Sequence, residues 1–239
     1  NPGWQVADLP VAAGVGRIFS HLDACGAVED LGHGIPRPLA ARRPRAHLRV
    51  AGAGAVAAAP NQDLAEYVRN LFRTPYYRVY TSTDVMGCEL SGAIKSVIAL
   101  AVGISIGMGF GENTQAMLIT RGLNEVARLC AAHGSDPLSA AGLAGMGDLV
   151  ASCGSPLSRN RTFGEALGRT GSMAKAREQV AKTVEGVASA SAVVEIAHRV
   201  GVEVPVIEAV NEIVNHSLSP AEALTKLMEI TTRAENFIR

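Results

Sequence analysis

The sequence has little charge of either sign and no excess of one sign over the other. Its 239 residues include 22 basic and 22 acidic side chains, so the formal net charge is zero. A chain that binds nucleic acid through its phosphates is expected to carry an excess of Lys and Arg, so nothing here indicates a nucleic-acid partner. Aromatic residues are also scarce, at 4%. The abundant alanine and glycine are typical of a helix-rich globular protein with one large domain or two small ones.

Cysteine is sparse and unpaired in the sequence. The four cysteines, Cys25, Cys88, Cys130 and Cys153, lie far apart and form no CxxC motif. Zinc sites and disulfide frameworks need closer or repeated spacings. We therefore expect no metal site, and a reducing, cytoplasmic location.

Uninterrupted apolar runs are missing as well. The most apolar stretch, from Ala93 to Met108, contains Lys95 and several serines and glycines, and it is too short and interrupted to span a bilayer. The segment NPGWQVADLP has no basic region followed by an apolar run. The sequence predicts neither membrane insertion nor a signal peptide.

Residues 1–59 carry little periodic signal. Residues 35–59 contain five arginines and no lysine or acidic residue. Neither helical nor strand periodicity is sustained, apart from an expected short helix over 15–24. We expect this region to be irregular or disordered. Its composition is also what translation of a GC-rich gene in another reading frame would give, a hypothesis that comparison of all three frames would test.

Regular patterns begin after Pro60. Asn61 is a good N-cap for an amphipathic helix, and YYRVYTST alternates as a strand does. These two elements occupy 60–84. Residues 85–239 are predicted to form an all-α domain, so the fold class is mainly α. Its expected helices cover 86–107, 113–133, 136–144, 158–169, 185–200, 204–215 and 219–228.

Lys95 stands alone on an apolar, glycine-rich helix. It is the only charged residue between Glu89 and Glu112. Such a lysine either extends along the surface to reach water or is held in a site. In a site, a partly buried lysine can serve as the acid/base of a carbonyl-reducing or alcohol-oxidising enzyme.

The stretch GMGDLVASC offers a second polar group. Asp148 follows two glycines, and Ser152 lies one turn later. The carboxylate could pair with a lysine or accept hydrogen bonds from substrate hydroxyls. Equally, Asp148 could simply cap a helix.

SRNR, residues 158–161, is the more specific pattern. Ser158 can cap a helix, which places Arg159 and Asn160 in its first turn. Free backbone N–H groups and the helix dipole favour an anion there, and arginine adds charge-assisted hydrogen bonds. Cations in a first turn oppose the dipole, so a bound phosphate would compensate them. The alternative is a solvated turn.

Two glycine-rich stretches are weak signals. Gly52-x-Gly54-x-x-Ala57 has the spacing of a dinucleotide fingerprint, but Pro60 follows closely and the sequence shows no βαβ unit around it. GMGFGENT, residues 107–114, is predicted to be a turn between helices, with Asn113 as the cap.

Together these segments resemble the bacterial NAD(P)-dependent glycerol-3-phosphate dehydrogenases. The resemblance runs from about Pro60 to the C-terminus, and it implies that residues 60–84 are a short remnant of an α/β Rossmann-type nucleotide domain. It rests on several long motifs in order: LFRTPYYRVYTSTDVMGCELSGAIKSVIALAVG, GFGENTQAMLITRGLNEVARL, GMGDLVASCGSPLSRNRTFGEALG and TVEGVASA.

The resemblance implies a role for each matching residue. Lys95 matches the catalytic proton donor and acceptor, which also contacts the substrate, and Asp148 matches a carboxylate that binds substrate and orients the lysine. Ser152 stands where a substrate-contacting hydroxyl is expected. Residues that match the grip on the substrate phosphate are Ser158, Arg159 and Asn160. Those expected to contact the nucleotide are Arg159, Thr183 and Glu185.

The implied reaction is reversible reduction of dihydroxyacetone phosphate to sn-glycerol 3-phosphate with NADPH or NADH, for phospholipid synthesis. The implied partner is a small phosphorylated triose, and a homodimer is a candidate assembly. The family's second substrate lysine and its early glycine fingerprint have no match here. An alternative is therefore a non-catalytic helical remnant that lacks a cofactor site. A relative acting on another hydroxy acid is a third option, which SRNR disfavours because a plain carboxylate needs no phosphate grip.

Overall fold

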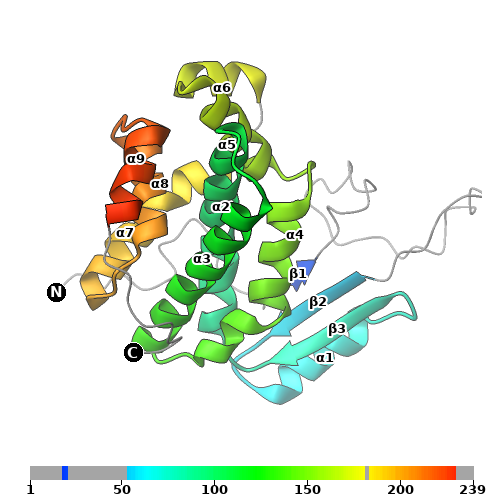
Figure 1. Cartoon of the computed structure of the whole chain (residues 1–239). Coiled ribbons are helices and arrows are strands. Elements are labelled where there is room, and N and C mark those ends of the chain that lie inside the picture. Colours follow the sequence, from blue (N-terminus) through cyan, green and yellow to red (C-terminus); the bar gives the residue numbers. More distant parts are fainter. Residues whose placement is uncertain (1–17, 21–52, 181–182, 230–239) are drawn as a thin grey trace, which may run out of the picture.

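The computed structural model describes residues 18–20, 53–180 and 183–229. A bundle of helices makes up most of this part, and a small sheet with one helix lies against one end of the bundle (Figure 1). The strands are β1 (Ile18–Ser20), β2 (Ala53–Ala58) and β3 (Tyr77–Ser82), and α1 (Gln62–Phe72) connects β2 to β3. The mainly α fold class is confirmed.

The bundle contains two long helices and several shorter ones. They are α2 (Val85–Gly107), α3 (Glu112–Ala132), α4 (Asp148–Gly154), α5 (Arg159–Thr170), α6 (Met173–Gln179), α7 (Glu185–Val200), α8 (Pro205–Asn215) and α9 (Pro220–Glu229). Between α3 and α4 lie a 3₁₀ turn, η4 (Pro137–Ala141), and a π-helical turn, η5 (Leu143–Gly147).

The sheet corrects the expectation that residues 1–59 are irregular throughout. β2 pairs in parallel with β3, and β1 pairs with β2 in antiparallel fashion. β2, α1 and β3 thus form a βαβ unit, which the sequence analysis wrongly excluded. The strand was missed because Ala55 to Ala58 are all buried, so no polar alternation marks it. The other residues of 1–52 lie outside the described part, and β1 replaces the central part of the helix expected over 15–24.

The glycine pattern at 52–57 overlaps strand β2. Gly54 is a strand residue paired with Arg78 of β3, and Ala57 pairs with Thr81. A dinucleotide fingerprint needs these positions in the turn between a strand and a helix. This segment therefore does not supply a phosphate-binding turn.

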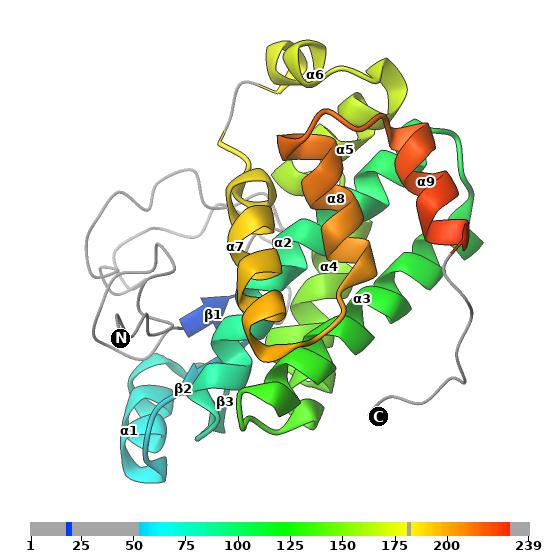
Figure 2. The same ribbon diagram turned by 90° about the vertical axis from the view of Figure 1, so that its left-hand side faces the viewer.

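α2 is the central helix of the bundle (Figure 2). Its N-cap, Asp84, accepts hydrogen bonds from the backbone N–H of Gly87 (3.0 Å) and from the hydroxyl of Ser139 (2.6 Å), which ties α2 to η4. Among the described helices, only α2 is long and apolar enough to cross a membrane. However, 72% of its most apolar window is buried within the protein, as expected for a core helix.

α2 and α5 approach each other through glycines on both helices. A Cβ on Gly103 would lie 2.1 Å from the carbonyl oxygen of Arg161, and one on Gly164 would lie 2.3 Å from that of Leu100. Gly107 and Gly168 are equally close to the opposite backbone. Real Cβ atoms do not approach backbone this closely, so this contact requires glycine. The packing fixes α5 relative to the C-terminal half of α2.

Local predictions were most accurate where caps are strong. Asn61 accepts a hydrogen bond from the backbone N–H of Leu64 (2.8 Å), and Ser158 caps α5 as predicted. The helix expected over 136–144 is wrong, because η4 and η5 replace it. Gly111, not Asn113, is the N-cap of α3. Two short helices, α4 and α6, were not predicted because seven residues give too little periodicity.

Glu125 is an almost fully buried carboxylate on α3. It accepts hydrogen bonds from the backbone N–H groups of Val206 (2.8 Å) and Ile207 (3.2 Å), at the start of α8. Burial raises its pKa to about 8, although these two donors act in the opposite direction. Glu125 thereby supplies the N-cap that α8 lacks in its own sequence.

This burial predicts a pH-dependent stability. Because the pKa of Glu125 rises from 4.5 to about 8 on folding, the folded state holds the proton more tightly than the unfolded chain. Stability should therefore fall as the pH rises from about 4.5 through about 8. Glu125→Gln, which stays neutral, should flatten this dependence in thermal unfolding. The control Glu178→Gln, at an exposed position, should show the same change of thermal midpoint with pH as the parent. If Glu125→Gln also showed the same pH dependence as the parent, Glu125 would not be the group responsible.

Candidate functional site

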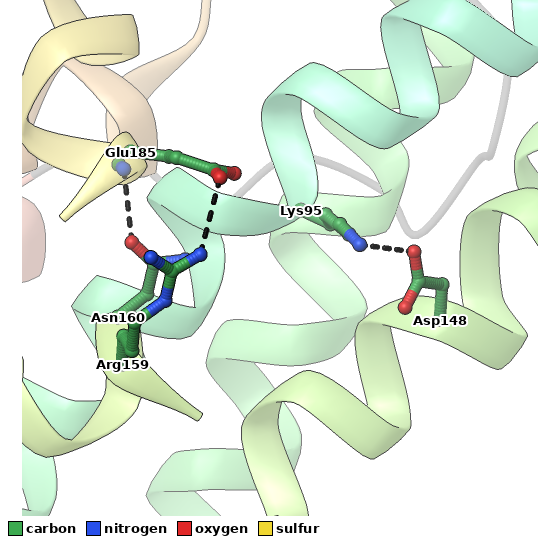
Figure 3. Close-up of polar contacts among 6 residues, drawn as sticks. Lys95, Asp148, Arg159, Asn160 and Glu185 are labelled. Carbon is green, nitrogen blue, oxygen red and sulfur yellow. Dashed lines mark hydrogen bonds and ion pairs between the residues drawn. The ribbon is translucent and has the colours of Figure 1, made fainter. Parts of the chain in front are cut away.

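Lys95 and Asp148 form an ion pair between α2 and α4 (Figure 3). Their side chains are only 23% and 13% exposed, so the lysine does not extend into solvent. The ammonium lies at a narrow, mostly apolar crevice whose other lining residues are Ser91, Ile98, Leu123, Val126, Gly145 and Leu149. Of the two alternatives for Lys95, extension along the surface into water does not match this geometry, and its role in a site stays a prediction.

The turn η5 directs Asp148 toward Lys95. Asp148 is the first residue of α4, and Gly147 occupies the N-cap position, where no side-chain hydrogen bond is made. The capping role considered for Asp148 is therefore not the one it has in the structure. Its side chain points across to α2, as Figure 3 shows.

The N-terminus of α5 meets the N-terminus of α7. Arg159 forms an ion pair with Glu185, with Nη2 3.3 Å from Oε1. The next residue, Asn160, accepts a hydrogen bond at Oδ1 from the backbone N–H of Gly186 (2.9 Å). Two consecutive residues of α5 thus contact two consecutive residues of α7.

The charge of Arg159 is compensated from within the chain. A cation in the first turn of α5 opposes the helix dipole, and the sequence predicted a bound anion as compensation. In the structure Glu185 takes this position, and the two side chains are about half exposed, at 47% and 62%. The ion pair is therefore weak, and a phosphate with two or three negatively charged oxygens can compete for Arg159.

The remaining predicted residues lie close by in sequence. Ser158 caps α5 by accepting a hydrogen bond from the backbone N–H of Arg161 (3.4 Å). Ser152 is half-buried on α4, one turn beyond Asp148, and Thr183 is exposed just before α7. In the described ranges, no group of three or more His, Cys, Asp or Glu side chains could hold a metal ion.

Gly186 was not predicted as part of this arrangement. A Cβ at this position would lie 2.5 Å from the carbonyl oxygen of Ser96, the residue that follows Lys95. The start of α7 therefore lies against α2 beside Lys95 and also against Asn160 of α5. A glycine directly after a helix-starting glutamate was the available sequence signal, but a glycine inside a helix does not by itself reveal a close contact.

A family model for the C-terminus of NAD-dependent glycerol-3-phosphate dehydrogenases matches residues 84–225. This chain belongs to that family. The match covers α2 to α9 almost completely, including all the predicted site residues. The resemblance found in the sequence is thus confirmed.

Individual relatives agree with the family model. The glycerol-3-phosphate dehydrogenase [NAD(P)+] of Thermobifida fusca is 43% identical over 246 residues, covering 99% of this chain and 71% of the relative. That of Streptomyces coelicolor is 47% identical over 204 residues, covering 85% and 58%. These alignments extend into the first 59 residues, ahead of the Pro60 start of the resemblance described above.

A solved structure shows the same architecture. Glycerol-3-phosphate dehydrogenase from Coxiella burnetii superposes with a TM-score of 0.71 at 34% identity, covering 75% of this chain and 55% of the Coxiella chain. This chain thus spans between about half and about seven tenths of the length of these relatives.

Proposed function

We propose that this chain takes part in the reversible reduction of dihydroxyacetone phosphate to sn-glycerol 3-phosphate with NADPH or NADH. The observation that carries the proposal is the arrangement around the middle of α2. A partly buried lysine–carboxylate pair lies there, and α7 joins that stretch of α2 to the arginine- and asparagine-bearing N-terminus of α5. One part suits a carbonyl oxygen and the other suits a phosphate.

Lys95 would exchange the proton. Its Nζ, as an ammonium, donates a proton to the carbonyl oxygen as that oxygen becomes an alkoxide, and in the reverse direction the amine accepts it. Asp148 holds the ammonium in place through the ion pair. The mostly apolar crevice around Lys95 limits access of water, which strengthens these interactions.

Ser158, Arg159 and Asn160 would bind the phosphate. Arg159 supplies a charged donor, Asn160 can donate through Nδ2, and the first turn of α5 offers free backbone N–H groups. Binding of the phosphate would draw Arg159 away from Glu185. Ser152, on the same helix as Asp148, would contact a substrate hydroxyl.

The residues expected at the nucleotide fit such a ligand. Glu185 is exposed at the start of α7, Thr183 is exposed two residues before it, and Arg159 of α5 pairs with Glu185. Carboxylate and hydroxyl oxygens can accept hydrogen bonds from a nicotinamide nucleotide, and Arg159 can bond to its anionic groups. When bound, the nucleotide supplies the hydride.

We further propose that two parts of the chain have different roles. The βαβ unit, which includes the predicted remnant 60–84, belongs to the nucleotide-binding part, and residues 85–239 form the substrate and catalytic part. The protein would act in the cytoplasm, with a homodimer as its candidate assembly. If NADPH fluorescence showed no binding, the chain would instead be the non-catalytic relative.

Replacing Arg159 by alanine should weaken binding of sn-glycerol 3-phosphate. Loss of a charge-assisted hydrogen bond costs about 1.5–3 kcal/mol, or roughly 10- to 150-fold in affinity. Titration calorimetry measures the change. Arg177→Ala, which removes an exposed arginine of α6, is the matched control and should bind as the parent does. Unchanged affinity in Arg159→Ala would remove this residue from the phosphate site.

A further inference from the structure

Gly186 lies where α2, α5 and α7 meet, and it leaves no space for a side chain. A Cβ there would lie 2.5 Å from the carbonyl oxygen of Ser96 and 3.1 Å from Oδ1 of Asn160. The first distance is shorter than real Cβ contacts, and the atom it meets is backbone that cannot rotate away. Glycine is therefore needed here for space.

The same residue determines how the Asn160 carboxamide is turned. The backbone N–H of Gly186 donates to Oδ1 of Asn160 at 2.9 Å. Since an N–H donor requires an acceptor, the oxygen of the amide must face Gly186, and the Nδ2 group must face the other way. Without this bond the amide could turn over and present its oxygen instead.

The orientation matters for an anionic ligand. A phosphate oxygen is attracted by the two N–H donors of Nδ2 and repelled by a carbonyl oxygen. The other contact of Gly186, with Ser96, places the same turn of α7 beside Lys95. This contact adds to the α2–α5 glycine packing in setting how far the phosphate-binding residues lie from Lys95.

We propose that Gly186 is a positioning residue for phosphate recognition: it locks the Asn160 amide with Nδ2 toward the phosphate. This inference rests on the function proposed above. Gly186 itself touches neither the substrate nor the reacting atoms. Its effect on binding is transmitted through Asn160.

The test is titration calorimetry of the whole chain with sn-glycerol 3-phosphate. Gly186→Ala should weaken binding by at least about tenfold, as loss of an oriented hydrogen bond to a charged group does. Gly111→Ala is the matched control, since a Cβ there meets nothing within 4 Å, and it should bind as the parent does. Parent-like affinity in a folded Gly186→Ala variant would overturn the inference.

A double-mutant cycle separates positioning from a general structural effect. If Gly186 acts through Asn160, Gly186→Ala should change affinity by less than about twofold when Asn160 is already alanine. An equally large loss in that background would overturn the inference. If the parent protein does not bind sn-glycerol 3-phosphate, the proposed function fails. If the parent binds it and Gly186→Ala binds it equally well, only the inference about Gly186 fails.

If Gly186→Ala does not fold, a second variant tests the same inference. Asn160→Asp keeps an oxygen to accept the Gly186 N–H but replaces the Nδ2 donors with a negatively charged oxygen. We expect a thermal midpoint close to that of the parent and a loss of sn-glycerol 3-phosphate binding of at least about tenfold. Parent-like affinity in Asn160→Asp would overturn the inference.

Discussion

Replacing Lys95 by alanine should lower turnover of dihydroxyacetone phosphate by at least about a thousandfold. Lys95 is partly buried, paired with Asp148 and lines a mostly apolar crevice, and in the proposed function it is the group that gives its proton to the carbonyl oxygen. NADPH oxidation, followed by absorbance, measures the effect. The assay is made on this chain and on a chimaera that carries a relative's nucleotide-binding domain ahead of Asn61.

Two comparisons make the Lys95 experiment specific. Lys175→Ala removes an exposed lysine of α6 and should leave turnover unchanged. Asp148→Asn should also lower turnover severely, because it removes the charge that holds the ammonium. Cofactor binding should survive in the Lys95 variant, since Lys95 acts on the substrate oxygen. Full activity of Lys95→Ala would show that the proton comes from another group.

Gly164→Ala should cost the largest amount of stability among the single-methyl changes considered. The added Cβ would lie 2.3 Å from the carbonyl oxygen of Leu100 and 2.9 Å from the backbone nitrogen of Ile104, so α5 must move away from α2. Overpacking of this kind typically costs about 1–3 kcal/mol and sometimes more. Urea unfolding gives the free energy, and Gly111→Ala serves as the control with open space around it.

The same substitution links stability to the site. Because α5 carries Arg159 and Asn160 at its start, displacing it should also weaken binding of sn-glycerol 3-phosphate in the fraction that stays folded. A Gly164→Ala protein as stable as the parent would show that the helices are not held at the observed distance.

The helical part of the fold could be predicted because caps and periodicity coincide there. α2, α5 and α7 begin and end within a residue of their expected positions. β2 escaped prediction because a strand buried on both faces shows no alternation and because alanine favours helices. The turn η5, which directs Asp148, follows from packing against α2 and leaves no pattern in sequence.

In the candidate site, too, some features could be predicted from the sequence and others could not. Lys95, Asp148 and the SRNR segment could be found because charged residues in apolar surroundings are conspicuous. Their partners could not be derived from spacing: Lys95 and Asp148 are 53 residues apart, and Arg159 and Glu185 are 26 apart. That Glu185 compensates Arg159, and that Gly186 contacts Asn160, depends on how α7 returns to α2 and α5.

The most direct test of the proposed site compares two ligands that differ by one phosphate. Titration calorimetry with sn-glycerol 3-phosphate and with glycerol asks whether the start of α5 binds an anion while the Lys95–Asp148 pair binds the hydroxyl end. We predict that the phosphate ester binds at least about a hundredfold more tightly, as expected for two or more charge-assisted hydrogen bonds. Equal affinity for glycerol and its phosphate would contradict the assignment of Ser158, Arg159 and Asn160 to a phosphate site.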